Sequence, residues 1–404
     1  MKNVIVFFCL AMLILADIPA LGQQIENNAN GRKEIIGYYP SWKWRTMDNP
    51  MTPEKIPYNM LTMINYAFFY PLPDGEIVGR DSVADEMILK GERDSTTGTF
   101  KSGTALTDLA HHHGVKVLLS VGGWADSYNF PEVASSDPTR KAFAHSCVEQ
   151  IKKFGFDGID IDWEFPCYVA HNGTPDDKVN CTLLLQITRD SLDALEKLTG
   201  RKLLLTAALP AGAETAAGFE VEKISGFLNM LNVMTYDFCG PWDSLSGYNS
   251  PLYAPRADDS VRNVDAAFKL YTQTYNIPAS KINIGVPFYA HTFMQCTAPY
   301  ASFNGTDSVH FPLHGSDYND VVKVMDKFRR YWDDRAKVPY LISSEWNEFI
   351  SYDDEESVGA KSQYVLDNNA HGIGIWEITG DYLPNGESPL LNVIYTKFNG
   401  KERK

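Results

Sequence analysis

Eight short apolar runs recur along the chain, separated by stretches with a helical hydrophobic period. Several of the runs are almost continuously apolar, which is typical of strands buried on both faces of a parallel sheet. The predicted strands cover residues 34–39, 61–68, 115–121, 158–164, 202–207, 230–236, 282–287 and 372–377. Parallel strands that alternate with helices in this number predict a closed α/β structure, the (β/α)8 TIM barrel, whose active site lies at the carboxyl ends of the strands.

The segments between the strands predict helices at 138–154, 183–197, 258–275 and 357–369. Asp137 is expected to cap the first helix, and Pro138 suits its opening turn. About 85 residues separate the last two strands, far more than an ordinary loop. The segment 289–352 mixes aromatic-rich short runs with one helix predicted at 318–332, so we expect a small α+β subdomain inserted on the rim between strands seven and eight.

The first 22 residues have the pattern of a cleaved secretory signal peptide. Lys2 precedes the apolar run 4–16, and small residues follow at 20–22. This run is too short for an ordinary membrane-spanning helix. We therefore expect an exported monomer, secreted or periplasmic, without membrane association after cleavage, whose residues 23–404 form one barrel domain.

Lysine and arginine total 36 against 51 aspartate and glutamate, giving a net charge of -15. Such a charge excludes nucleic acid as a partner. Cys167 and Cys181 bracket a polar loop, where they either form a disulfide or stay free. The sequence has no CxxC pair, and the consecutive His111, His112 and His113 point in different directions, so we expect a polar helix end there and neither a metal nor a cofactor.

The fourth predicted strand carries the most informative pattern. Side chains alternate along a strand, so Asp160, Asp162 and Glu164 share one face while 159, 161 and 163 are apolar on the other. In a barrel the carboxylates would point inward, toward the mouth. Burying unpaired like charges costs several kcal/mol, so a purely structural role does not explain these carboxylates. One alternative, a solvated acidic strand at the edge of a sheet, would require polar residues on the opposite face as well. A second alternative is that the same carboxylates bind a metal ion. A functional site explains the pattern best, because closely spaced carboxylates push their pKa values apart, which leaves one group protonated as a general acid and another ionised to stabilise positive charge.

These residues also carry a resemblance. Asp157-x-x-Asp160-x-Asp162-x-Glu164 resembles the DxxDxDxE signature of glycoside hydrolase family 18, the chitinases and their relatives. The runs 120–123 and 234–237 resemble the family's SxGG and MxYD motifs, Trp376 resembles its eighth-strand tryptophan, and the insertion is similar to the α+β insertion domain of one chitinase subfamily.

The resemblance implies a retaining mechanism in which the substrate's own acetamido group is the nucleophile. Glu164 would protonate the leaving oxygen, and Asp162 would orient the acetamido group and share a proton with Asp160. Tyr236 would bond the acetamido carbonyl, and Asp237 would hold the distorted sugar. Asp157 is out of phase with the other carboxylates and has a supporting role, and Ser120, with the glycines after it, is expected to shape a tight strand end. The expected substrate-binding set is Tyr38, Trp42, Phe68, Gly123, Trp124, Met234, Trp242, Tyr289 and Trp376.

Two positions depart from the family pattern. His291 stands where many members carry arginine, which leaves open the substrate contact that the resemblance implies for Tyr289. The sequence assigns no role to Cys239, which lies near the cleft. The leading functional prediction is an exported endo-chitinase acting on β-1,4-linked N-acetylglucosamine polymers and oligosaccharides. An endo-β-N-acetylglucosaminidase acting on N-glycans or peptidoglycan is the alternative hydrolase. A non-catalytic chitin-binding lectin is the third possibility, although lectins of this kind normally lack the acid that Glu164 supplies.

Overall fold

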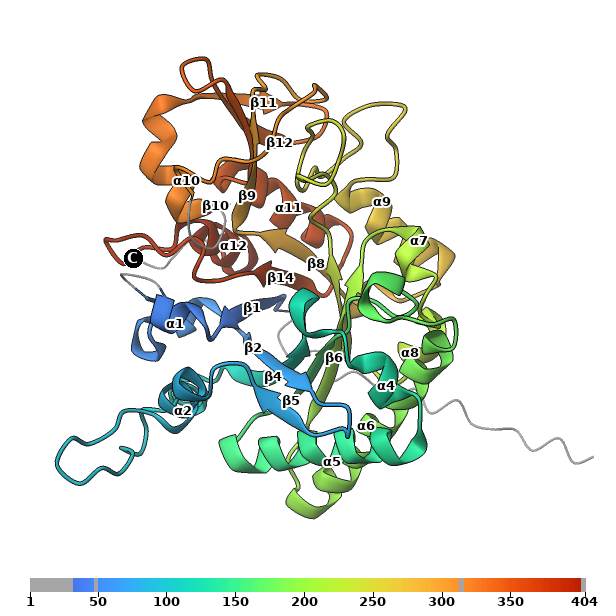
Figure 1. The fold of residues 1–404 in the computed structure, drawn as a ribbon. Coiled ribbons are helices and arrows are strands. Elements are labelled where there is room, and N and C mark those ends of the chain that lie inside the picture. Colours follow the sequence, from blue (N-terminus) through green and yellow to red (C-terminus); the bar gives the residue numbers. More distant parts are fainter. Residues whose placement is uncertain (1–31, 47–49, 312–315, 401–404) are drawn as a thin grey trace, which may run out of the picture. The chain divides into compact units, whose positions relative to one another are not determined.

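The eight predicted strands pair side by side into a closed parallel barrel (Figure 1). The computed structural model describes residues 32–46, 50–311 and 316–400, so the predicted signal peptide lies outside the described residues. Strand β1 pairs with both β14 and β2, which closes the ring. The barrel strands are β1 (Glu34–Pro40), β2 (Met63–Pro71), β4 (Lys116–Gly122), β5 (Gly158–Asp162), β6 (Leu204–Pro210), β7 (Met230–Met234), β8 (Ile282–Pro287) and β14 (Gly372–Trp376). A short strand, β3 (Ile77–Gly79), pairs antiparallel with β2.

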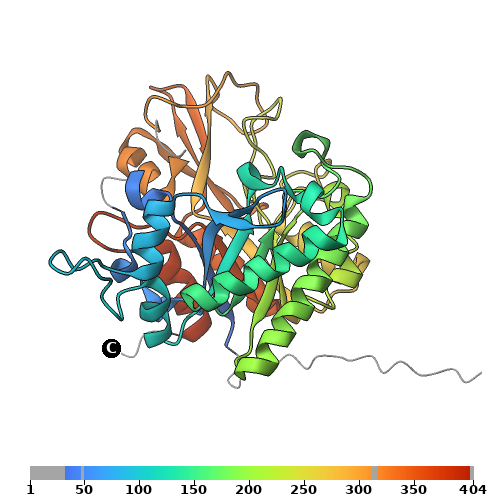
Figure 2. The same ribbon diagram turned by 60° about the horizontal axis from the view of Figure 1, so that its bottom comes forward.

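Helices cover the outside of the barrel, and Figure 2 shows α5 and α6 running beside each other. The α-helices are α1 (Lys43–Thr46), α2 (Ser82–Lys90), α3 (Leu106–His112), α4 (Phe130–Ala134), α5 (Asp137–Phe154), α6 (Asp177–Thr199), α7 (Ala213–Ala216), α8 (Val221–Ile224), α9 (Val264–Lys269), α10 (Tyr318–Val324), α11 (Glu355–Asp367) and α12 (Pro389–Asn399).

Four details of the helix prediction are wrong, and the first is that α6 begins at residue 177 rather than 183. The cap of α5 is Ser136, whose side chain accepts from the Thr139 amide, while Asp137 already belongs to the first turn. Helix α9 begins at residue 264 rather than 258, because the Asn263 side chain caps it there. The helix predicted at 318–332 ends at residue 324, and β11 (Arg329–Asp333) follows it because that segment pairs with a neighbouring strand.

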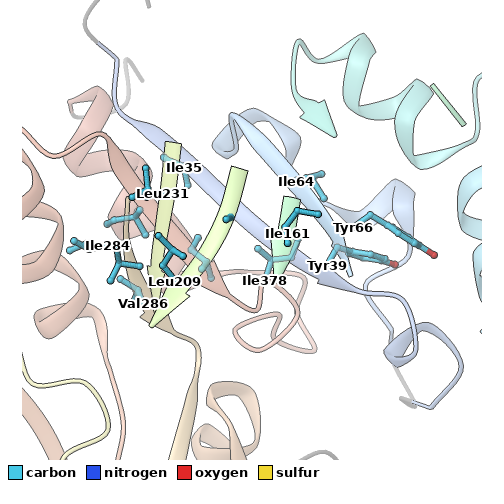
Figure 3. Packing of buried hydrophobic residues seen from close by; sticks show 14 of the residues in the cluster. Ile35, Tyr39, Ile64, Tyr66, Ile161, Leu209, Leu231, Ile284, Val286 and Ile378 are labelled. Atoms are coloured by element: carbon cyan, nitrogen blue, oxygen red, sulfur yellow. The ribbon is translucent and has the colours of Figure 1, made fainter. Parts of the chain in front are cut away.

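Apolar side chains on the outer faces of the strands form the main core between barrel and helices. Figure 3 shows part of this cluster, in which Ile35, Ile64, Ile161, Leu231 and Ile284 come from different strands and are buried. A second, smaller cluster of Ile36, Met63, Leu118 and Met230 comes from positions of the opposite parity. It fills the barrel interior below a layer of polar side chains, since alternate residues of each strand point inward.

Between β8 and β14 the chain forms a separate five-stranded antiparallel sheet, as expected for an α+β insertion (Figure 1). Its strand order is β10 (Ser316–Asp317), β9 (Tyr289–Met294), β13 (Glu348–Ser351), β12 (Val338–Ser343) and β11. Strand β9 follows β8 after one residue, so the sheet is joined directly to the carboxyl end of a barrel strand.

Two further observations bear on the sequence predictions. Cys167 and Cys181 are free thiols in the structure, so this pair does not form the disulfide that was one of the two alternatives. Over the described ranges, every helix is too short or too polar to cross a lipid bilayer.

Candidate active site

Strand β5 has the predicted alternation of carboxylates and apolar residues. Asp160 and Asp162 are buried inside the barrel, and Ile159, Ile161 and Trp163 are buried on the outer face. The Trp163 ring stacks on Phe130 of α4 with centroids 5.1 Å apart. The packed outer face fixes the register of the strand and so forces the carboxylates inward.

Asp160 is the most completely hydrogen-bonded carboxylate of the site. Its Oδ2 accepts from the Tyr38 hydroxyl at 3.0 Å and the Ser120 hydroxyl at 2.7 Å. Its Oδ1 accepts from the Thr206 hydroxyl at 2.5 Å and the Asn232 amide at 3.2 Å. Burial raises the pKa of Asp160, and these donors oppose that effect by stabilising the anion. The proton expected to be shared between Asp160 and Asp162 stays a prediction.

Asp162 and Glu164 lie nearer the mouth, and their carboxyl groups are less completely hydrogen-bonded than that of Asp160. Burial, and then the charges of Glu164 and Asp160, raise the pKa of Asp162 well above its usual range. Its Oδ1 is buried without a hydrogen-bond partner among the described residues, which leaves an acceptor available to a ligand. Burial, and then the charge of Asp237, raise the pKa of Glu164 to about 8, so its carboxyl carries a proton at neutral pH.

The backbone of Glu164 is held at both ends. Its amide donates to the Ser127 hydroxyl at 2.9 Å, and its carbonyl lies 2.5 Å from Nδ1 of the buried His171. The Ser127 hydroxyl in turn donates to the Gly123 carbonyl at 2.9 Å. The loops after β4 and β5 are therefore tied together around the acid, which limits how far Glu164 can move.

The two glycines of the SxGG run allow β4 and its loop to approach β5 and β2. A Cβ atom on Gly122 would lie 2.1 Å from the Asp162 carbonyl oxygen, and one on Gly123 would lie 2.6 Å from the Phe68 ring. Both residues have positive φ angles, 117° and 87°, which other residues rarely adopt. The run thus positions Asp162, and Gly123 also borders an aromatic residue of the site.

The MxYD run ends β7 and brings Tyr236 and Asp237 to the mouth beside Met234, which is half-buried. Burial, and then the neighbouring carboxylates, raise the pKa of Tyr236 well above its usual range, so its hydroxyl remains a donor. Asp237 Oδ1 accepts from the Tyr289 hydroxyl at 2.6 Å and lies 2.8 Å from His291 Nε2. Tyr289 and His291 therefore both contact Asp237, and the substrate contact expected of Tyr289 stays a prediction.

Three aromatic residues from β1, β2 and β14 gather at the same end of the barrel with Trp42, which lies in the turn after β1. Trp376 stacks on Phe68 with centroids 5.5 Å apart and planes at 18°, and lies 5.6 Å from Tyr38. Trp42 stacks on Phe68 at 6.0 Å. Since the Tyr38 hydroxyl also binds Asp160, this aromatic floor adjoins the carboxylates directly.

A cavity of about 370 Å³ extends from this floor toward the insertion sheet and is lined by Trp42, Trp376, His291 and Asp307, among others. Lys43 lies in its wall and forms buried ion pairs with Asp317 of β10 and Glu377 after β14. These pairs tie the floor to the inserted sheet.

The remaining two tryptophans of the expected set are exposed. Trp124 has 54% of its surface exposed and Trp242 has 65%. Trp124 lies against His171 at 4.5 Å, and Trp242 lies against His291 at 5.3 Å. Each ring therefore lies beside a histidine that contacts Glu164 or Asp237, and each leaves an indole face available to a ligand.

Three residues named in the sequence analysis lie outside this constellation. Asp157 is a structural brace, since it bonds the Val117 amide, Arg201 and His111 at the start of β5. His111 therefore belongs to a polar helix end, as predicted. The Cys239 thiol is buried and donates to the Leu245 carbonyl at 3.4 Å.

Sequence reasoning missed Thr206, Asn232, Ser127 and His171. A signal existed for the first two, because each is a polar residue at an inward position of an otherwise apolar strand. Ser127 and His171 lie in loops, where no periodic pattern marks them.

A barrel whose mouth combines a protonated carboxyl group, buried carboxylates and an aromatic floor defines a glycoside hydrolase. The family model described as glycosyl hydrolases family 18 matches residues 34–381. The chain belongs to this family, which confirms the resemblance carried by its motifs.

Known proteins extend the comparison. The chain is 35% identical over 430 residues to Chitinase A1 of Niallia circulans, covering 93% of this chain and 60% of that protein. It is 31% identical to Chitinase 1 of Aphanocladium album, covering 94% of this chain and 90% of that one. The second catalytic domain of the Ostrinia furnacalis Group II chitinase, solved as a mutant in complex with penta-N-acetylchitooctaose, matches with a TM-score of 0.81 at 25% identity, covering 92% of this chain and 97% of that one.

Proposed function

We propose that this protein is an endo-acting chitinase that hydrolyses β-1,4-linked N-acetylglucosamine polymers with retention of configuration. The observation that carries the proposal is the pairing of a protonated Glu164 with a buried Asp162 that has an unused acceptor oxygen. The chitinases among the relatives support the substrate class.

In this mechanism Glu164 is the general acid. Its pKa of about 8 keeps the carboxyl protonated at neutral pH, so it can donate to the glycosidic oxygen as the bond breaks. The anion that remains then accepts a proton from the water that completes hydrolysis. The ties from Ser127 and His171 to the Glu164 backbone hold the acid in place for both steps.

The nucleophile is the substrate's acetamido carbonyl oxygen, which attacks the anomeric carbon. The free Oδ1 of Asp162 accepts from the acetamido N–H and stabilises the positive charge of the oxazolinium intermediate. Tyr236 remains protonated and donates to the acetamido carbonyl. Asp237, fixed by Tyr289 and His291, holds the distorted sugar ring above Trp376.

The binding surface suits a long linear substrate. The aromatic floor, the adjoining cavity and the exposed Trp124 and Trp242 offer stacking faces on several sides of the carboxylates. Sugar rings present apolar C–H faces to such rings. The insertion sheet deepens this groove, which favours internal cleavage of a polymer. The N-terminal sequence pattern supports export.

An endo-β-N-acetylglucosaminidase is the second candidate, because the acetamido group is the chemically required part of the substrate. Incubation with chitin hexamer and, separately, with an N-glycosylated protein, followed by mass analysis, distinguishes the two. The proposal predicts shortened chitin oligomers and intact glycans. Released glycans with uncut hexamer would favour the second candidate, and binding without any product would indicate a lectin.

A further inference from the structure

A second cluster of ionisable side chains lies in the insertion. Asp307, His310 and Glu348 each offer one ligand atom, and these atoms lie within 4.8 Å of one another. Asp307 and Glu348 are 4% and 2% exposed, whereas His310 is more accessible. No step of the proposed hydrolysis uses this cluster.

The loop that carries Asp307 and His310 is folded so that both side chains meet. Asp307 Oδ1 accepts from the amides of Val309 and His310, each at 2.9 Å, and Oδ2 lies 2.5 Å from His310 Nδ1. The His310 ring stacks on Trp346 with centroids 3.8 Å apart and planes at 5°. The imidazole is therefore fixed before any ligand binds.

Glu348 approaches this pair from the first position of β13. Its Oε1 is buried and has no hydrogen-bond partner among the described residues. A buried carboxyl oxygen without a donor is satisfied by a proton or by a cation, and Asp307 and His310 are the nearest ionisable groups that could share either with Glu348.

We propose that Asp307, His310 and Glu348 bind a divalent transition-metal ion, for which Zn²⁺ is the best match. One imidazole nitrogen and two carboxylate oxygens form a ligand set that zinc accepts, with water in the fourth position. Calcium and magnesium prefer oxygen ligands alone and in larger number. The two carboxylates balance the charge of the ion, and the accessible side of His310 provides an entry path.

The ion would link the loop at 307–310 to strand β13 of the insertion sheet. Asp307 also lines the cavity beside the aromatic floor. The expected effect is therefore a stabilised rim, measured as zinc affinity and unfolding temperature independently of any hydrolytic activity.

The test uses the untagged full chain, treated with EDTA and then desalted. Titration calorimetry should show one equivalent of Zn²⁺ bound, and scanning calorimetry should show an unfolding temperature raised by several degrees with zinc but not with Mg²⁺. Glu348→Gln and His310→Phe should each weaken zinc binding at least tenfold. The phenylalanine keeps the stacking on Trp346, so this variant decides the question if Glu348→Gln fails to fold. Glu345→Gln, an exposed residue of the same turn, should bind as the parent does.

Two results would overturn the proposal. One is the absence of stoichiometric zinc binding to the parent protein, which would mean that the carboxyl groups share a proton instead. The other is zinc binding that survives in His310→Phe with unchanged affinity, which would place the ion elsewhere.

Discussion

His291 Nε2 lies 2.8 Å from Asp237 Oδ1, so a side chain of the inserted sheet contacts a carboxylate at the barrel mouth. Tyr289 donates to the same oxygen at 2.6 Å. After burial, the charge of Asp237 is the largest cause of the raised pKa of Glu164. The insertion therefore positions the Asp237 carboxylate, whose negative charge raises the pKa of the proposed acid, Glu164.

Asp237→Asn should move the alkaline limb of the kcat/KM profile to lower pH. Activity requires protonated Glu164 and so falls as pH rises through its pKa of about 8. Removing the negative charge of Asp237 lowers that pKa, by roughly one unit or less. A pH–rate profile on a chitin oligomer measures the shift. Asp258→Asn, which removes an equal charge from an exposed loop, should leave the limb in place. An alkaline limb common to both variants and the parent would contradict this role of Asp237.

Glu164→Gln should lose turnover while keeping oligosaccharide binding, because the amide retains the shape of the side chain but cannot donate the leaving-group proton. The expected loss is about 10²–10⁴-fold in kcat, the usual contribution of general acid catalysis. Turnover of chitin hexamer and calorimetric binding are measured on the same preparation. The exposed Glu214→Gln is the matched control and should behave as the parent. More than about a hundredth of the parent rate in Glu164→Gln would identify another residue as the acid.

Gly122→Ala should destabilise the protein and impair catalysis together. The new Cβ atom would lie 2.1 Å from the Asp162 carbonyl oxygen, and the φ angle of 117° adds strain. A cost of about 3 kcal/mol is expected from overpacking and backbone strain combined. Gly103→Ala separates the two causes, because its φ is 81° and no atom lies within 4 Å of the place that its methyl group would occupy. Denaturant unfolding of both variants measures the difference, and equal costs would contradict the close-approach explanation.

The barrel was predictable from sequence because its strands are apolar runs of the right length, and β5 because its carboxylates repeat with a period of two. Residues 329–332 fall within the predicted helix, but their pairing with β12 makes them part of strand β11. The donors Thr206 and Asn232 meet Asp160 through the register of three strands, which a single sequence does not specify. The cluster of Asp307 and Glu348 likewise joins segments that are distant in sequence.

EDTA should leave turnover of a short chitin oligomer unchanged at temperatures well below unfolding. In the proposed mechanism the proton comes from Glu164 and the nucleophile from the substrate, so no step requires a metal-bound water. The ion proposed for the Asp307 cluster affects the unfolding temperature rather than the reaction. Initial rates before and after chelation provide the measurement. Loss of activity that a divalent ion restores would indicate that the carboxylates of β5 hold a catalytic metal.

We propose that the substrate's acetamido group acts as the nucleophile of the reaction. Without that group, Asp162 and Tyr236 lose their partner, and a buried polar group left unpaired costs about 1–3 kcal/mol even before the missing nucleophile is counted. The direct test is NMR of the first products released from chitin oligomers, with fully deacetylated chitosan oligomers and cellulose oligomers as matched substrates. We predict an initial β-anomer from chitin and no cleavage of the other two. An initial α-anomer, or appreciable cleavage of the fully deacetylated chain, would contradict the claim even if chitin is degraded.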